Sequence, residues 1–330
     1  MALINGTKLA DMIETAMNED NQVWARGGDD MVTGGKLNDL LHGGRGDDTL
    51  NGGRGDDTIY GDTGNDSIKG TVGNDTIFAG QGDDWVSGGK NVDVISGGMG
   101  NDKLDGNTGD DVMAGGSGDD VMNGDAGNDW MFGGRGNDKV YGGSGDDTVM
   151  ASSGNDVYSG GSGYDTLDYS HMAGKLSIDL GKHTATIGSG KAFSTDTVSG
   201  FEVVIGNDNG NKFVGDRTDT HFVGGAGADW FRGLTGSDTL TGGAGADTFA
   251  YLKKDTVGGG VDTITDFQVG TDKLDMKDFL KGHANYGQSV RFADDGAGDT
   301  VVQGLVAHKW VDVAILKGVD VHSVGFDILA

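Results

Sequence analysis

The sequence predicts an all-β protein built as a parallel β-roll, a solenoid in which short strands stack coil upon coil. Three observations predict this fold: a nine-residue repeat, a high glycine content and the absence of proline. The 330 residues include 66 Gly, no Pro and no Cys. Glycine supplies the positive φ angles of tight loops, and a parallel ladder needs the N–H group that proline lacks. Such a polar composition would otherwise favour disorder, and the repeat decides against it.

The repeat runs from Ala25 to Asp168 as sixteen nonapeptides without a change of phase. Its consensus is G-G-x-G-[DN]-D-x-U-x, in which U is a large apolar residue. The sixth position is Asp and the eighth position is apolar in all sixteen units. The x-U-x triplet predicts a very short strand with one inward side chain. Two nonapeptides make one 18-residue coil, so the block predicts eight stacked coils.

The charge of the chain is strongly negative and is carried almost entirely by aspartate. The 52 acidic residues outnumber 24 Lys and Arg, for a net charge of −28, and Glu14, Glu19 and Glu202 are the only glutamates. This bias indicates carboxylates held at fixed places on short stems. The net charge disfavours nucleic acid and anionic membranes as partners and attracts cations. The absence of Cys excludes disulfides and thiolate metal sites.

The sixth-position aspartates form two predicted ladders, because residues 18 apart lie above each other in such a roll. One ladder contains Asp30, Asp48, Asp66, Asp84, Asp102, Asp120, Asp138 and Asp156, and the other contains Asp39, Asp57, Asp75, Asp93, Asp111, Asp129, Asp147 and Asp165. Carboxylates stacked about 4.8 Å apart repel each other and resist desolvation unless a cation lies between them. Oxygen ligands without His or Cys favour Ca²⁺ over zinc. The gaps within the two ladders predict about fourteen calcium ions.

The nonapeptide resembles that of the RTX (repeat-in-toxin) proteins, the haemolysin-type calcium-binding repeat family. The segment Gly43–Asn51 carries the motif complete. The resemblance implies a calcium-loaded parallel β-roll. We therefore expect a chain that is unfolded where calcium is scarce and that folds on binding calcium outside the cell.

The main roll, residues 25–168, is flanked by segments of different character. Residues 1–24 form an N-terminal cap, either a short helix or two decayed repeats, and the repeats are favoured. The helix would carry Leu9, Met12, Ile13 and Ala16 on one side, whereas the repeats would pair Asp11 with Ile13 and Asn21 with Val23. Residues 169–205 read as a β excursion or linker. They resemble the excursions between roll blocks of RTX proteins.

A second, shorter block is predicted at residues 206–250. Asp229, Asp238 and Asp247 occupy the metal-ligand position of its last three units, and Asn211 and Thr220 replace Asp in the first two. Only Asp229 and Asp247 are 18 residues apart. We therefore expect about one full-strength calcium site in this block.

Residues 251–330 are predicted to form a β-rich C-terminal cap that carries a secretion signal. The segments Val261–Phe267 and Asp272–Asp275, with the terminal Asp327–Ala330, are similar to the C-terminal region of type I secretion substrates. The resemblance implies export through an ABC transporter with a C-terminal signal. Residues 1–24 contain no signal-peptide core, and the sequence has no transmembrane run. Alternatively, the segment only caps the roll and prevents edge pairing.

The function expected from these features is binding without catalysis. The sequence lacks H-E-x-x-H, G-x-S-x-G and P-loop motifs, so we expect no enzyme. An outward apolar stripe with Tyr60, Phe78, Trp130 and Phe132 could contact sugar rings, another protein or a second copy, unless the chain itself covers it. We expect a secreted adhesion, matrix or polysaccharide-binding module. The alternatives are an effector that alters membrane ion permeability and an enzyme with unrecognised chemistry in residues 251–330.

Overall fold

The fold is all-β, as the sequence predicts. The computed structural model describes residues 2–15, 18–189, 192–256, 260–282 and 285–329. These residues form two compact units, Met1–Leu167 and Asp168–Ala330. The helices of the described residues are single 3-10 turns, and all of them lie in the second unit.

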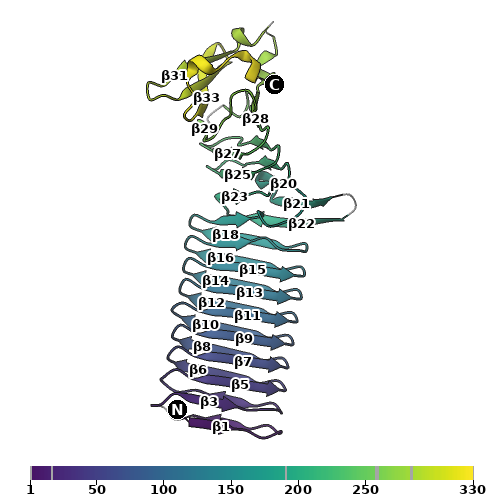
Figure 1. The fold of residues 1–330 in the computed structure, drawn as a ribbon, viewed down its shortest axis with the longest axis vertical. Coiled ribbons are helices and arrows are strands. Elements are labelled where there is room, and N and C mark those ends of the chain that lie inside the picture. The colour runs from purple at the N-terminus through teal and green to yellow at the C-terminus, as the bar shows by residue number, and fades with distance from the viewer. Residues whose placement is uncertain (1, 16–17, 190–191, 257–259, 283–284, 330) are drawn as a thin grey trace. The chain divides into compact units, whose positions relative to one another are not determined.

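The first unit is a parallel β-roll in which successive strands alternate between two sheets (Figure 1). Sheet A contains β1 (Ala2–Asn5), β3 (Asn21–Trp24), β5 (Leu40–Arg45), β7 (Thr58–Thr63), β9 (Thr76–Gln81), β11 (Val94–Met99), β13 (Val112–Ser117), β15 (Trp130–Arg135) and β17 (Thr148–Met150). Sheet B contains β2 (Met12–Glu14), β4 (Met31–Thr33), β6 (Thr49–Arg54), β8 (Ser67–Val72), β10 (Trp85–Lys90), β12 (Lys103–Thr108), β14 (Val121–Ala126), β16 (Lys139–Ser144) and β18 (Val157–Ser162). Strand β19 (Thr166–Asp168) spans the boundary of the units. The register is one coil of 18 residues, so that Ile68 lies beside Leu50 and Val86.

The strands are longer than the predicted x-U-x triplet. In β6, for example, the strand continues through Gly52, Gly53 and Arg54 of the following unit. The first position of the unit is crowded, and it is glycine in thirteen of the sixteen units and alanine in the other three, Ala25, Ala79 and Ala151. At Gly52 an added Cβ would lie 2.3 Å from Oδ2 of Asp57. The turn therefore shrinks to positions four to six of the repeat.

The core of the roll is a column of eighth-position side chains. All sixteen, from Val32 to Leu167, are at most 1 % exposed. Their burial removes apolar surface from water at roughly 25 cal/mol per Å². Each side chain packs between the same positions of the coils above and below, so the core is continuous although each unit contributes one large residue.

The N-terminal segment is built as strands and not as a helix. Strand β2 pairs in parallel with β4 so that Ile13 lies beside Val32, and β3 pairs with β5 so that Val23 lies beside Leu41. Ile13 and Val23 are both buried. The β1 and β3 strands pair in the same way. Ala16, which the helical alternative would use, lies outside the described residues.

The second unit contains the excursion, the second block and the C-terminal segment. Its strands are β20 (Lys175–Asp179), β21 (Thr184–Ser189), β22 (Ala192–Ser199), β23 (Val203–Ile205), β24 (Lys212–Val214), β25 (His221–Gly225), β26 (Trp230–Arg232), β27 (Thr239–Gly243), β28 (Thr248–Ala250), β29 (Asp262–Ile264), β30 (Lys273–Asp275), β31 (Val290–Asp294), β32 (Thr300–Val306) and β33 (Lys309–Leu316). Its 3-10 turns are η1 (Leu180–Lys182), η2 (Lys277–Leu280), η3 (Tyr286–Gln288), η4 (Val321–Ser323) and η5 (Phe326–Ile328). Strands β23 to β30 continue the parallel pairing in two sheets.

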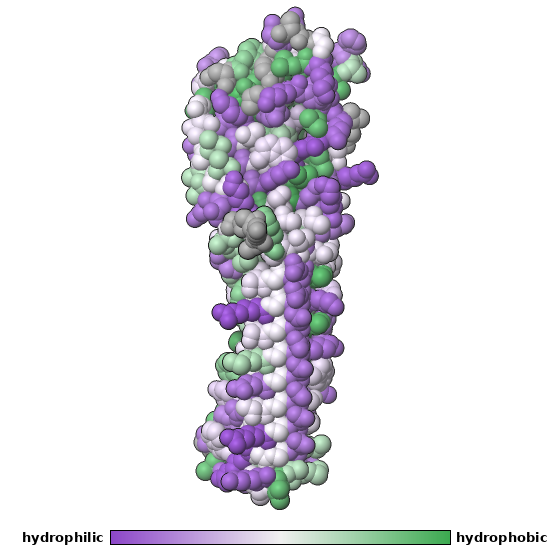
Figure 2. Space-filling model, turned by 90° about the vertical axis from the view of Figure 1, so that its right-hand side faces the viewer, coloured by the Kyte–Doolittle hydropathy of each residue, from purple (hydrophilic) through white to green (hydrophobic). Residues whose placement is uncertain are grey.

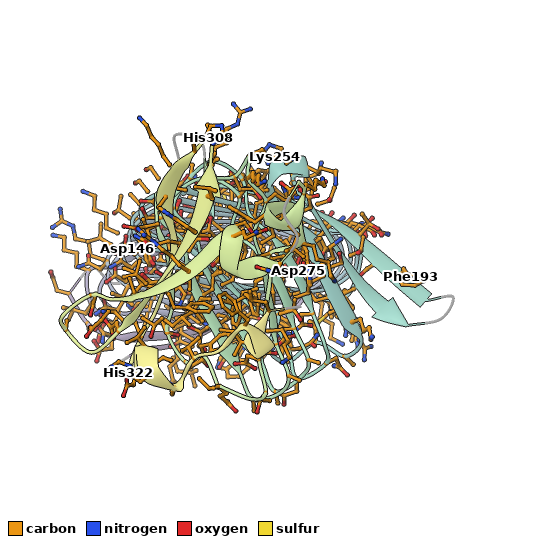
Figure 3. The ribbon with its side chains drawn as sticks, turned by 90° about the horizontal axis from the view of Figure 1, so that it is seen from above. Asp146, Phe193, Lys254, Asp275, His308 and His322 are labelled. Atoms are coloured by element: carbon orange, nitrogen blue, oxygen red, sulfur yellow. The ribbon has the colours of Figure 1, made fainter. Side chains whose placement is uncertain are left out.

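The excursion is an antiparallel arrangement of β20, β21 and β22, of which β20 also pairs in parallel with β24. The β21–β22 hairpin projects from the rest of its unit, and Phe193 on it is 64 % exposed (Figure 3). The excursion thus adds strands to a sheet without adding a coil.

The C-terminal segment covers the last strand of one sheet. Strands β31, β32 and β33 form an antiparallel meander, and β33 pairs in parallel with β29. Thr263 of β29 lies beside Ile315 of β33. The meander therefore satisfies backbone groups that an open sheet edge would expose.

The glycine at position four, present in fourteen of the sixteen units, is a sensitive point of the fold. Gly118 has a φ of +132°, and an added Cβ would lie 1.8 Å from the carbonyl oxygen of Gly100. We expect Gly118→Ala to lower the free energy of unfolding by about 3 kcal/mol, because strain and collision add. Gly296→Ala is the matched control, since its φ is +81° and no atom lies within 4 Å of an added Cβ. The control should cost about 1 kcal/mol in urea unfolding, and equal losses would contradict the role of the collision.

Candidate metal centre

Each sixth-position aspartate is tied by its own side chain to the preceding coil. The backbone N–H of Asp48, for example, donates to Oδ1 of Asp66 over 2.8 Å, and that of Asp66 donates to Oδ1 of Asp84 over 2.7 Å. The same bond forms at every step of both predicted ladders. All sixteen aspartates are buried. The structure thus brings the predicted residues together in two columns, one at each row of turns.

The second carboxylate oxygen of these aspartates is buried without a partner. In thirteen of the sixteen, from Asp30 to Asp147 with the exception of Asp39, Oδ2 is enclosed by protein and accepts no hydrogen bond from the described residues. Leaving a buried charged oxygen unpaired costs several kcal/mol. A repeated orphan oxygen of this kind indicates that a group outside the chain completes its environment.

In Asp39 and Asp156 the second carboxylate oxygen has a hydrogen-bond partner within the chain. Oδ2 of Asp39 accepts the N–H of Gly35 over 2.6 Å. Oδ2 of Asp156 accepts the hydroxyl of Tyr158 over 2.7 Å. Tyr158 is the only tyrosine at the eighth position of the sixteen units. This residue therefore indicates from the sequence that the surroundings of Asp156 differ from those of the other ladder aspartates. A ligand at these two places would compete with bonds that the chain already makes.

Backbone carbonyl oxygens lie beside the orphan carboxylates. An added Cβ at Gly61 would lie 2.4 Å from Oδ2 of Asp66 and 2.4 Å from the carbonyl oxygen of Ala79. Gly142 borders Oδ2 of Asp147 and the carbonyl oxygen of Gly160 in the same way. Both kinds of oxygen therefore border the same small space, which glycine keeps open. Calcium prefers this donor set of carboxylate and carbonyl oxygens.

Burial perturbs the ladder carboxyls strongly. It raises the pKa of Asp57 to about 8 and that of Asp48 to about 7, although a backbone hydrogen bond lowers each pKa in part. Neighbouring ladder carboxylates add to the rise. The negative form is thus disfavoured in the folded chain alone, and a divalent cation would restore it.

The residues fit calcium, and the ladder aspartates with the adjacent carbonyl oxygens would hold it. Bound calcium would supply two positive charges between carboxylates that otherwise repel. No cluster of three or more His, Cys, Asp or Glu side chains that could hold a metal occurs among the described residues. The ladder differs from such clusters, because each step contains few carboxylates and the remaining oxygen ligands would be backbone carbonyl groups.

The ladders extend further than the sequence reasoning predicted. In the second unit, the N–H groups of Asn211 and Asp229 donate to Oδ1 of Asp229 and Asp247, and Thr220 donates to Asp238. Asp238 then donates to Oδ1 of Asp262 over 3.1 Å, and Asp247 donates to Asp272 over 3.0 Å. These last steps cross 24 and 25 residues instead of 18.

Asp262 and Asp272 were therefore missed as ladder members, although both begin a D-x-U triplet, Asp262-Thr263-Ile264 and Asp272-Lys273-Leu274. That triplet was the available signal. The ladder also reaches the N-terminal segment, where the N–H groups of Asp11 and Asn21 donate to Oδ1 of Asp30 and Asp39. The final Asp327–Ala330 ends in Ala330, which lies outside the described residues.

The fifth-position side chains form further ladders, which are exposed on the outside of the turns. The N–H of Asn65 donates to Oδ1 of Asp47 over 2.7 Å, and that of Asp83 donates to Oδ1 of Asn65. Asp and Asn alternate along part of this column, which separates like charges by two coils. A continuous hydrophilic stripe runs along the repeats on the face shown in Figure 2. Here the donor lies in the later coil, opposite to the direction of the buried ladders.

The apolar stripe of sheet A is exposed in part. Phe78 and Trp130 are 40 % and 39 % exposed, whereas Tyr60 and Phe132 are half-buried. The rings of Trp24, His42, Tyr60 and Phe78 stack with centroids 3.8, 4.5 and 5.1 Å apart. Stacking therefore covers both faces of the Tyr60 ring, and this column contributes to cohesion between coils.

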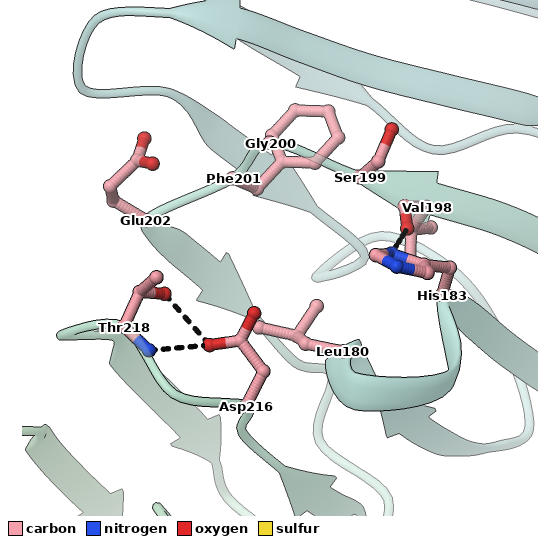
Figure 4. A pocket seen from close by; sticks show the side chains of 9 residues that line it. All are labelled: Leu180, His183, Val198, Ser199, Gly200, Phe201, Glu202, Asp216 and Thr218. Atoms are coloured by element: carbon pink, nitrogen blue, oxygen red, sulfur yellow. Dashed lines mark hydrogen bonds between the residues drawn. The ribbon is translucent and has the colours of Figure 1, made fainter. Parts of the chain in front are cut away.

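A pocket of about 210 Å³ lies in the second unit beside η1 (Figure 4). Nδ1 of His183 lies 3.2 Å from the carbonyl oxygen of Val198, and Oδ1 of Asp216 accepts the N–H and hydroxyl of Thr218. His183 and Asp216 are thus engaged with local backbone and loop partners. Among the described residues, no helix is long and apolar enough to cross a membrane.

The fold and the ladders define a calcium-binding parallel β-roll. The chain matches the RTX calcium-binding nonapeptide repeat (4 copies) at residues 15–41, 33–68, 69–104, 105–140, 132–167 and 214–251. It belongs to the RTX calcium-binding nonapeptide repeat family. The matched residues include the decayed repeat that follows residue 15.

Among solved structures, the chain is similar to the extracellular lipase LipA from Serratia marcescens. The identity is 16 %, the TM-score is 0.25, and the alignment covers 65 % of this chain and 40 % of the lipase chain. The chain thus spans less than half of that lipase. None of the curated proteins compared with the chain matches it.

Protonation of the ladder carboxyls should stabilise the roll in part when calcium is absent. Burial raises the pKa of Asp66 to about 6, that of Asp48 to about 7 and that of Asp57 to about 8, so the folded chain without metal binds protons more tightly than the unfolded chain. Its stability is therefore highest below about pH 4 and is lost as pH rises through 6 to 8. Far-UV circular dichroism of metal-stripped protein should show more β structure at pH 5 than at pH 8. An unchanged or smaller β signal at pH 5 would contradict the burial of these carboxyls.

Removing one ladder charge should weaken calcium binding locally. Asp102→Asn keeps an oxygen for the N–H of Asp84 but removes the carboxylate. We expect calcium affinity at the adjoining sites to fall at least about tenfold, as even outer partners of metal ligands contribute that much. Asp119→Asn is the matched control, since Asp119 lies in the exposed fifth-position ladder. Isothermal titration with calcium should separate the two variants, and equal affinities would contradict the ligand assignment.

Proposed function

We propose that this chain is a secreted, non-catalytic binding protein that folds on calcium outside the cell and then attaches to extracellular polysaccharide or matrix. The observation that carries the proposal is the double column of buried carboxylates with unpartnered Oδ2 atoms. A roll with such columns is stable only when cations neutralise them. The chain would therefore stay unfolded at low calcium and fold at the higher calcium concentration outside the cell.

Secretion is supported by the same conditional folding. A transporter channel passes an unfolded chain, and the C-terminal segments Val261–Phe267 and Asp272–Asp275 resemble those of type I secretion substrates. Asp262 and Asp272 also belong to the ladder of the second unit. The proposed export signal and the last calcium-dependent coils therefore share residues.

A binding role is favoured by the outward faces of the roll. The seventh and ninth positions of each unit point away from the core and repeat at about 4.8 Å along each sheet. A surface with this regular spacing suits a repetitive polymer better than a single small molecule. The sixth-position aspartates, by contrast, are committed to the ladders, and we propose no catalysis for them.

Calcium should switch both folding and attachment. We expect chelated protein to give a disordered far-UV spectrum at pH 7.5 and to regain β structure on calcium addition. The calcium-loaded chain should co-sediment with exopolysaccharide or envelope material of the producing cell, whereas the chelated chain should not. Release of dye from liposomes by the loaded chain would instead support a membrane effector. Folding without calcium, or attachment independent of it, would contradict the proposal.

A further inference from the structure

A cationic trough runs along the outer face of sheet B in the first unit. Two hollows, with volumes of about 750 and 400 Å³, meet at Thr71 and together extend from Thr15 to Thr108. These residues lie five coils apart, which corresponds to about 24 Å at the strand spacing. Second-position residues form the floor, and Gly35, Gly53 and Gly89 leave it open for lack of side chains.

The charge of the trough opposes that of the chain. Lys36 and Arg54 line the first hollow, Lys69 and Lys90 line the second, and Glu14 is the single acid that lines either. Among the described residues, no ion pair engages any of the four cations, although the chain carries 52 acids. Four cations without an ion-pair partner along one trough create a local positive potential on a chain whose residues sum to a charge of −28.

The other lining groups are those that recognise sugars. Trp85 is half-buried, and the ammonium of Lys69 lies 5.2 Å from its ring centroid. Hydroxyls and amides stand beside them, as in Ser87 with Asn107 and Thr71 with Asn51. An aromatic ring packs against the apolar face of a sugar, hydroxyls and amides bond its hydroxyls, and cations pair with carboxylates.

We propose that this trough binds a linear acidic polysaccharide whose sugar units carry carboxylates. The inference rests on the proposed function and names the site and ligand class for it. The length of the trough fits several sugar units in a row, and its unpaired cations fit a chain of spaced negative charges. Single-stranded DNA, which carries phosphates in place of carboxylates and has no sugar ring with free hydroxyls at every position, is the competing ligand in the test.

The test compares two triple variants of the calcium-loaded full chain with equal loss of charge. Lys36→Gln, Arg54→Gln and Lys90→Gln remove three of the four trough cations, and Lys8→Gln, Arg135→Gln and Lys139→Gln remove two lysines and one arginine that do not line the trough. The probes are galacturonate hexasaccharide, which is too short to gel with calcium, a neutral glucose hexasaccharide and single-stranded DNA. Calorimetry measures binding, and circular dichroism verifies that each variant folds with calcium.

The wild type should bind the galacturonate oligomer and should bind the neutral oligomer at least tenfold more weakly. The trough variant should lose at least tenfold in affinity, and the control variant less than threefold. Equal losses in both variants, or equal binding of neutral sugar or DNA, would overturn the trough as a site for acidic sugars. Calcium-dependent attachment to envelope material would still support the proposed function in that case, and its absence would count against that function separately.

Discussion

The structure depends on one arrangement, an aspartate whose two carboxylate oxygens have different roles. Oδ1 accepts the backbone N–H of the equivalent residue one coil earlier, which fixes the spacing of the coils. Oδ2 is left buried and unpaired beside a carbonyl oxygen. The first role makes the column regular, and the second makes it unfavourable without a cation. Aspartate is required because its short stem keeps both oxygens within the turn.

The hydrogen bonds of the buried and exposed ladders run in opposite directions along the roll. In the buried ladder the earlier coil donates, as Asp48 does to Asp66, and in the exposed ladder the later coil donates, as Asn65 does to Asp47. Each turn is thus linked to both neighbours by side chains in addition to the sheet bonds. Only the buried column depends on metal, because the exposed carboxylates remain solvated and alternate with amides.

The sequence predicted the roll and the sixteen main ladder aspartates because an unbroken period of nine fixes which residues share a column. It did not predict Asp262 and Asp272, because the coils before them have 24 and 25 residues and the period is lost. The strands of six residues also escaped prediction, since glycines at positions one and two are weak strand formers in isolation. Which oxygen of each aspartate is free depends on side-chain orientation, which no spacing reveals.

The coil also determines how much the length of the chain changes when the roll unfolds. A folded coil of the roll adds about 4.8 Å to its length, whereas the same 18 residues fully extended span up to about 60 Å. Because each coil contacts only its neighbours, unravelling can proceed one coil at a time from an end. Between two anchored points, the main roll would therefore act as an extensible tether whose stiffness is set by the calcium concentration around it.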